Sequence, residues 1–184
     1  ASMTEADRAL RWRFWAALAV LFVLLLWLLN NILLPFVVGM VAMNKGWAMD
    51  RKGFNEAFRA FGIFWQKHQN AVLFMHSEKF GAAEGINLVE LAIHAGIPEH
   101  AIVWSDQYAY RLGFPPNMMA AAYTAMDVLL APSHGEGFCV PLIEAQACGT
   151  PVLSLHRGAI PELVVDGGTG WLREHHLDLV EDRK

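Results

Sequence analysis

The sequence predicts an α/β domain in which a parallel sheet is flanked by helices. From residue 36 onwards, short apolar runs typical of buried strands alternate with amphipathic stretches typical of helices. Strands that alternate with helices pair in parallel through right-handed crossovers, so that both sheet faces are covered. With 184 residues, the chain is long enough for one such domain and too short for two large ones.

The first half of the domain is expected to contain three strands and two helices. The strands are predicted from continuous apolar runs, and the first helix from apolar side chains that recur on one face. The second helix ends in glycine, a common helix stop. In chain order these elements are Phe36 to Met43 (strand), Lys52 to Gln66 (helix), Ala71 to Ser77 (strand), Gly85 to Gly96 (helix) and Ala101 to Trp104 (strand).

The second half continues the same alternation. Its second helix has Pro141 in the first turn, where the missing N–H does no harm. In chain order the elements are Pro116 to Met126 (helix), Asp127 to Ser133 (strand), Val140 to Gly149 (helix), Pro151 to Leu155 (strand), Ile160 to Val164 (helix) and Thr169 to Leu172 (strand). Ligands of such sheets bind at the carboxyl ends of the strands.

Charge and cysteine content exclude several classes of protein. A net charge of -4 and a pI near 6.0 argue against a nucleic-acid partner, which requires a basic face. The two cysteines, Cys139 and Cys148, match no zinc or redox spacing, and we interpret them as small buried thiols in a reducing compartment. No Asp-x-Asp cluster is present, so no metal and no cofactor are expected.

The N-terminal segment, residues 1–35, has a different character from the domain at 36–184. Residues 14–34 are almost entirely apolar and about as long as a membrane-spanning helix. Arg8, Arg11 and Arg13 precede them, which predicts membrane association with a cytoplasmic N-terminus. A signal peptide and a buried core helix are the alternatives, although no small-x-small cleavage site follows the run.

The loop after the predicted strand 127–133 is the strongest candidate site. It carries Gly135, Glu136, Gly137 and Phe138, and a helix follows through Cys139 and Val140. Unpaired N–H groups and the helix dipole at such a helix start suit a phosphate. Glu144, about one turn inside the helix, is placed to accept hydrogen bonds from a ribose diol. Glu136 lies nearer a group carried beyond the phosphates, so the spacing fits a nucleotide-sugar.

The motif "EGFCVPLIE" resembles the signature of the donor-binding domain of retaining GT-B glycosyltransferases, family 4 in particular. The likeness extends from Tyr123 to Leu172, and "DRKGFNEAFRAF" resembles the family's first crossover helix. The resemblance implies a Rossmann-like domain forming one half of a GT-B fold. It also implies that Glu136 faces the donor sugar, Glu144 binds ribose, and Arg51 with Lys52 binds the diphosphate.

This chain departs from the family pattern in two places. The arginine that usually ends the first strand is missing, and Asn44 and Lys45 stand near its position. The second Rossmann-like domain, which binds the acceptor, is also missing, and a separate chain is a candidate to supply it. In its place, the apolar N-terminal segment weakly resembles the first membrane helix of the autoinducer-2 exporter family of permeases.

The resemblance implies a membrane-tethered hexosyltransferase-type enzyme that transfers sugar from a nucleotide-sugar donor to an unknown acceptor. A non-catalytic nucleotide-sugar binding module is the alternative, as is a fragment or fusion with a permease-like helix. His76 and His134 stand at predicted strand ends and are weaker site candidates, since a lone histidine is more often structural.

Overall fold

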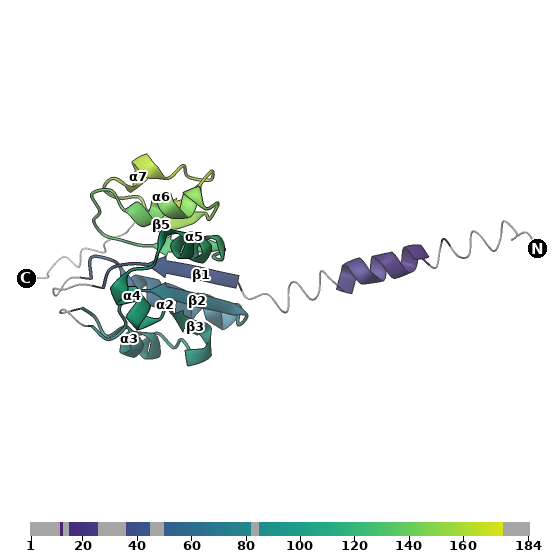
Figure 1. Ribbon diagram of the computed structural model, residues 1–184, viewed down its shortest axis with the longest axis horizontal. Helices are drawn as coiled ribbons and strands as arrows, with labels where there is room; N and C mark the ends of the chain where they lie inside the picture. Colours follow the sequence, from purple (N-terminus) through teal and green to yellow (C-terminus); the bar gives the residue numbers. More distant parts are fainter. Residues whose placement is uncertain (1–11, 13–14, 26–35, 45–49, 82–84, 175–184) are drawn as a thin grey trace, which may run out of the picture. The chain divides into compact units, whose positions relative to one another are not determined.

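The computed structural model describes residues 12, 15–25, 36–44, 50–81 and 85–174. By its internal contacts the chain divides into two units, residues 1–35 and 36–184, and each is described by itself. Figure 1 shows the chain with its elements labelled.

The predicted transmembrane span at residues 14–34 is not supported. Of these residues the structure describes 15–25, which are helical, and the others lie outside the described residues. Among the described residues, no helix has both the length and the apolar character needed to cross a membrane.

The second unit is built on one sheet in which every neighbouring pair of strands is parallel. The order is β3-β2-β1-β4-β5-β6, so the direction of strand addition reverses between β1 and β4 (Figure 1). The strands are β1 (Phe36–Val41), β2 (Ala71–His76), β3 (Ile102–Trp104), β4 (Val128–Ala131), β5 (Val152–Leu155) and β6 (Gly170–Arg173). This confirms the predicted parallel sheet.

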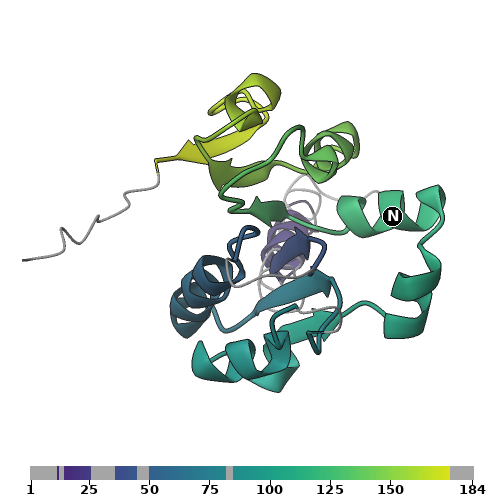
Figure 2. The same cartoon turned by 90° about the vertical axis from the view of Figure 1, so that its left-hand side faces the viewer.

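Helices cover both faces of the sheet, as Figure 2 shows end-on. They are α2 (Phe54–Lys67), α3 (Leu88–His94), α4 (Gln107–Leu112), α5 (Pro116–Thr124), α6 (Val140–Ala147) and α7 (Ile160–Leu163), with a 3₁₀ turn at η2 (Glu99–Ala101). The side chains of β1 alternate between the two layers: Val38 and Met40 join the core under α2 and α3. Val37 and Val41 face the core under α5, α6 and α7.

Each predicted strand and helix of this unit is present, with ends that differ by a few residues. Helix α4 was not predicted, because none of its residues is buried and the segment shows no apolar face. It starts at an N-cap aspartate, Asp106, whose carboxylate accepts a hydrogen bond of 2.7 Å from the backbone N–H of Ala109.

The strand order predicts a crevice between β1 and β4, where the direction of strand addition reverses. Where the order reverses, the connections after neighbouring strands run to opposite faces, and the crevice opens at the carboxyl ends of those strands. In this chain the strands are β1 and β4, and the predicted glycine-bearing loop follows β4.

Candidate functional site

A cavity of about 300 Å³ opens at the carboxyl ends of β1, β2 and β4. Apolar residues at the ends of β1 and β4 line much of it, together with Cys139 and Pro141 at the start of α6. Its polar lining consists of Lys52, His76, Tyr110, Ser133 and Glu136. The cavity therefore lies at the reversal of strand order and brings together residues from five separate segments.

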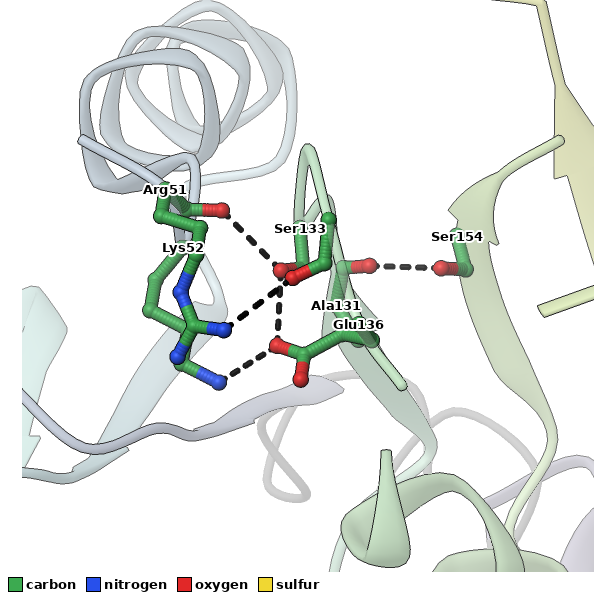
Figure 3. A network of polar contacts seen from close by, with 7 residues as sticks. Arg51, Lys52, Ala131, Ser133, Glu136 and Ser154 are labelled. Atoms are coloured by element: carbon green, nitrogen blue, oxygen red, sulfur yellow. Dashed lines mark hydrogen bonds and ion pairs between the residues drawn. The ribbon is translucent and has the colours of Figure 1, made fainter. Parts of the chain in front are cut away.

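A polar network lies on one wall of this cavity (Figure 3). Lys52 Nζ forms an ion pair with Glu136 Oε1, and Ser133 Oγ lies 2.7 Å from the same carboxylate oxygen. Ser133 Oγ also lies 3.0 Å from the backbone carbonyl of Arg51, and Arg51 Nη1 donates a hydrogen bond of 3.3 Å to the carbonyl of Gly135. The predicted basic pair and the predicted loop glutamate are thus brought together across 84 residues of sequence.

Gly53 allows the basic turn to approach the loop after β4. It precedes α2 with a φ of 71°, in the left-handed region that favours glycine. A Cβ at this position would lie 2.2 Å from the carbonyl oxygen of Pro132. The backbone N–H of His134 donates a 2.8 Å hydrogen bond to the Arg51 carbonyl, which fixes the same contact. A side chain at residue 53 would push Arg51 and Lys52 away from Glu136.

The Glu136 carboxylate is held in its ionised form. Burial alone would raise its pKa, but hydrogen bonds from Lys52 and Ser133 and the charges of Lys52 and Arg51 together hold that pKa below its usual value. The carboxylate is consequently an anion at neutral pH that accepts hydrogen bonds from donor groups in the cavity.

The start of α6 has the features of an anion site. Cys139 adopts a φ of 53° and is the one non-glycine residue with positive φ in the described part of the chain. Within that part, no backbone carbonyl accepts a hydrogen bond from the N–H groups of residues 135–140. These N–H groups and the positive end of the helix dipole favour a bound anion. Burial, followed by the charge of Glu136, raises the pKa of the Cys139 thiol, so the thiol adds no competing negative charge.

The exposure of the loop residues differs along this segment. Gly135 and Cys139 are partly buried, whereas Gly137, Phe138 and Val140 are exposed. Of the predicted residues in this segment, Glu136 and Cys139 line the cavity.

Glu144 lies exposed on α6, about one turn from the start of the helix. Its Oε2 accepts a hydrogen bond of 2.9 Å from the hydroxyl of Tyr123, a residue of α5 that is 1% exposed. Burial, the hydrogen bond to Glu144 and the charge of that carboxylate raise the pKa of Tyr123, so the phenol stays protonated and donates. Tyr123 was not predicted as a site residue, although it lies in the predicted helix Pro116 to Met126.

Asn44, which stands near the position of the missing arginine, does not line the cavity. Its side chain is 5% exposed and donates to the carbonyls of Glu78, at 2.7 Å, and Ile86, at 2.8 Å. Its Oδ1 accepts from the N–H of Ile86 at 2.9 Å. Asn44 is therefore a structural residue that ties β1 to the segment before α3. Lys45 lies outside the described residues.

The two candidate histidines have different surroundings. His76 lines the cavity, and its ring packs edge-on against Tyr110 and Phe114, with centroids 5.0 and 4.6 Å away. Burial lowers the pKa of His76, so its ring is neutral at pH 7. The His134 ring instead lies 3.5 Å from Glu56 on α2 and is not part of the cavity lining. Across the described ranges, no group of three or more His, Cys, Asp or Glu side chains is arranged to hold a metal ion.

Sheet order, helix placement and the loop at the reversal point together define a Rossmann-like domain. The chain belongs to the glycosyl transferases group 1 family, whose profile matches residues 41–180. The matched region contains every polar residue that lines the cavity. It begins at the end of β1, so nothing in it supports the resemblance of the N-terminal segment to a permease helix.

Curated relatives match part of this region. The chain is 37% identical over 97 residues to a D-inositol 3-phosphate glycosyltransferase of Segniliparus rotundus, covering 50% of this chain and 20% of the relative. It is 43% identical over 72 residues to the protein of the same name from Corynebacterium diphtheriae, covering 37% of this chain and 17% of the relative. The matched segment thus spans at most about a fifth of the length of these relatives.

Solved structures share the fold. The C-terminal domain of the glycosyl transferase group 1 protein LpcC from Francisella tularensis superposes with a TM-score of 0.59 at 24% identity, covering 80% of this chain and 72% of that one. Anabaena HepE, in complex with UDP and glucose, superposes with a TM-score of 0.56 at 23% identity, covering 80% of this chain and 37% of that one. These likenesses confirm the predicted GT-B half-fold.

Proposed function

We propose that this chain is the donor-binding half of a retaining GT-B glycosyltransferase, which takes a nucleotide-sugar into the cavity and transfers its sugar to an acceptor. One observation carries the proposal. The Lys52–Ser133–Glu136 network and the open N–H groups before α6 border the same cavity at the reversal of strand order. Membership of the glycosyl transferases group 1 family supports the assignment of the chemistry.

Each part of a nucleotide-sugar has a chemical partner in this arrangement. The N–H groups of residues 135–140, with Lys52 and Arg51, supply donors and positive charge for the diphosphate. The exposed Glu144 carboxylate accepts hydrogen bonds from the ribose diol, and Glu136 accepts them from the sugar. Similar folds in HepE, with UDP and glucose, and in a pneumococcal O-GlcNAc transferase, with UDP and GlcNAc, support this class of ligand.

The residues around the cavity can assist sugar transfer by stabilising the charge that develops during the reaction. As the bond between sugar and diphosphate breaks, negative charge grows on the leaving diphosphate. Fixed N–H donors stabilise that charge without reorganisation, and the Lys52 ammonium adds a positive charge, so no metal is required. Glu136 orients the sugar at the reacting centre. The acceptor binds to a second domain, which a separate chain or a further part of this protein supplies.

A thermal-shift screen of the full chain against UDP, GDP, ADP and their sugar conjugates tests the proposal. A ligand present at about 100 times its dissociation constant adds roughly 2.7 kcal/mol to the free energy of unfolding. No shift with any of these ligands would overturn the proposal. If a nucleotide-sugar binds but radiolabelled donor is neither transferred nor hydrolysed, the chain is a non-catalytic binding module instead.

A further inference from the structure

The polar network holds Glu136 by one carboxylate oxygen only. Both Lys52 Nζ and Ser133 Oγ contact Oε1, and within the described residues no hydrogen bond reaches Oε2. Oε2 is not among the fully buried polar atoms that lack a partner, so it keeps some exposure although the side chain as a whole is 10% exposed. Figure 3 shows the carboxylate with its second oxygen directed away from Lys52 and Ser133. The arrangement leaves one anchored oxygen and one available acceptor.

We infer that Ser133 is a positioning residue, which anchors Oε1 of Glu136 so that Oε2 is presented to the sugar of the donor. This inference rests on the proposed function, because it assigns a role to Ser133 in the same site. Ser133 itself contacts no part of the donor in this account. It acts through Glu136.

Ser133 is better placed than Lys52 to fix the direction of this carboxylate. It is 4% exposed and stands two residues after the end of β4, so its hydroxyl has little freedom. The lysine ammonium stands on a flexible four-carbon chain and can follow the carboxylate as it moves. A bound diphosphate would also compete with Glu136 for Lys52. Ser133 is the anchor that remains when the donor is bound.

The Ser133 hydroxyl also lies within hydrogen-bond distance of the Arg51 carbonyl. A hydroxyl carries one proton, so Ser133 donates either to Glu136 or to the carbonyl of Arg51 at a given moment. The Arg51 carbonyl already accepts a hydrogen bond of 2.8 Å from the N–H of His134. The Glu136 carboxylate, as the charged acceptor, is the stronger partner.

A double-mutant cycle tests whether Ser133 acts through Glu136. In the full chain, Ser133→Ala should weaken binding of the nucleotide-sugar about tenfold, the size of one hydrogen bond to a charged group, and spare the free nucleoside diphosphate. In a Glu136→Ala background the same change should have no effect on donor affinity. If Ser133→Ala lowers donor affinity equally in the wild-type and Glu136→Ala backgrounds, the inference is overturned.

Ser154→Ala is the matched control. Ser154 is 3% exposed, and its hydroxyl donates a 2.6 Å hydrogen bond to the carbonyl of Ala131, on the strand that leads to the loop (Figure 3). The control removes a buried hydroxyl of the same kind without touching Glu136. Its donor affinity should stay at the wild-type value. A loss equal to that of Ser133→Ala would mean that any buried hydroxyl here supports the loop, and the inference would fail.

A readout without ligand separates this inference from the proposed function. NMR titration of the Glu136 carboxyl carbon should show a higher pKa in Ser133→Ala than in wild type, and no change in Ser154→Ala. An unchanged pKa in Ser133→Ala would show that the hydroxyl does not anchor the carboxylate. If the pKa rises but the wild-type chain binds no nucleotide-sugar, the anchor is real and the assigned role toward a donor is wrong.

Discussion

Glu136 and Glu144 stand eight positions apart and occupy opposite environments. Glu136 is partly buried on a loop, paired with Lys52 and held by Ser133. Glu144 is exposed on a regular helix, with one hydrogen bond from the buried Tyr123 hydroxyl. One carboxylate is fixed by residues far away in sequence, and the other by its helix and a single neighbour.

This difference indicates why the two residues suit different parts of one ligand. A buried, anchored carboxylate beside a lysine is a precise acceptor whose direction the fold determines. An exposed carboxylate on a helix accepts hydrogen bonds from a diol that arrives from solvent.

Replacing Lys52 by alanine should have the largest effect on ligand binding. It removes the cation expected at the diphosphate and leaves Glu136, a partly buried anion, without its ion-pair partner. Both the nucleoside diphosphate and the nucleotide-sugar should bind about a hundredfold more weakly by calorimetry, a loss of about 3 kcal/mol. Lys67→Ala, at the exposed far end of α2, is the control and should bind as wild type. Equal affinities for Lys52→Ala and Lys67→Ala would remove Lys52 from the site.

Glutamine substitutions should separate the two glutamates. Glu144→Gln should weaken the binding of the free nucleoside diphosphate and of the intact donor to the same extent, because both carry ribose. Glu136→Gln should leave the binding of the nucleoside diphosphate unchanged and weaken only the binding of the intact donor. Each loss should be roughly tenfold to a hundredfold, since a hydrogen bond to a charged acceptor contributes about 1.5 to 3 kcal/mol. If both variants lose affinity equally for both ligands, the carboxylates only support the loop, and the contrast drawn here is wrong.

Tyr123→Phe should have a smaller effect through Glu144. It keeps the packed ring and removes the hydroxyl that orients the carboxylate, a contribution of about 1 kcal/mol. Both ligands should bind about fivefold more weakly. Tyr108→Phe, an exposed position on α4, controls for loss of a phenol. A Tyr123→Phe variant with wild-type affinity for ribose-containing ligands would show that Glu144 needs no orientation.

The smallest effect concerns pH and His76. Burial lowers the pKa of His76 in the folded chain, so its contribution to stability is present above its unfolded pKa of about 6.5. That contribution is lost as the pH falls through the lower pKa of the folded state. His76→Phe removes this term while keeping an aromatic ring beside Tyr110 and Phe114. Urea unfolding at pH 7.5 and pH 5.5 should show a smaller loss of stability on acidification in the variant. An unchanged loss would mean that His76 titrates as it does in the unfolded chain.

The alternation of apolar and amphipathic segments was sufficient to predict the sheet and its flanking helices. The central strands bury apolar side chains, and α2 buries one apolar face formed by Phe54, Ala57, Phe58 and Phe61, so the local pattern carries the information there. Helix α4 was not predicted because none of its residues is buried, so it presents no apolar face that a sequence pattern could reveal. The apolar composition of residues 14–34 predicted a span that the described residues do not support.

The motif around Glu136 and Glu144 identified the loop, but not what holds it. The Ser133 hydroxyl contacts the backbone carbonyl of Arg51, 82 positions away in sequence. The Tyr123 hydroxyl on α5 donates a hydrogen bond to Glu144 on α6. These contacts depend on the packing of separate elements, which a local pattern does not record. The same holds for Asn44, whose three hydrogen bonds to the segment around residues 78–86 make it structural.

The central claim is that the start of α6 and the two glutamates bind one nucleotide-sugar. An amide NMR titration of the ¹⁵N-labelled full chain with a nucleoside diphosphate, followed by its sugar conjugate, tests it most directly. The diphosphate should shift the amide signals of residues 135–140 and of Glu144, because its phosphates and ribose lie there. The sugar conjugate should add a change at Glu136 and Ser133. Shifts confined to other parts of the sheet, or identical shifts with both ligands, would contradict the account.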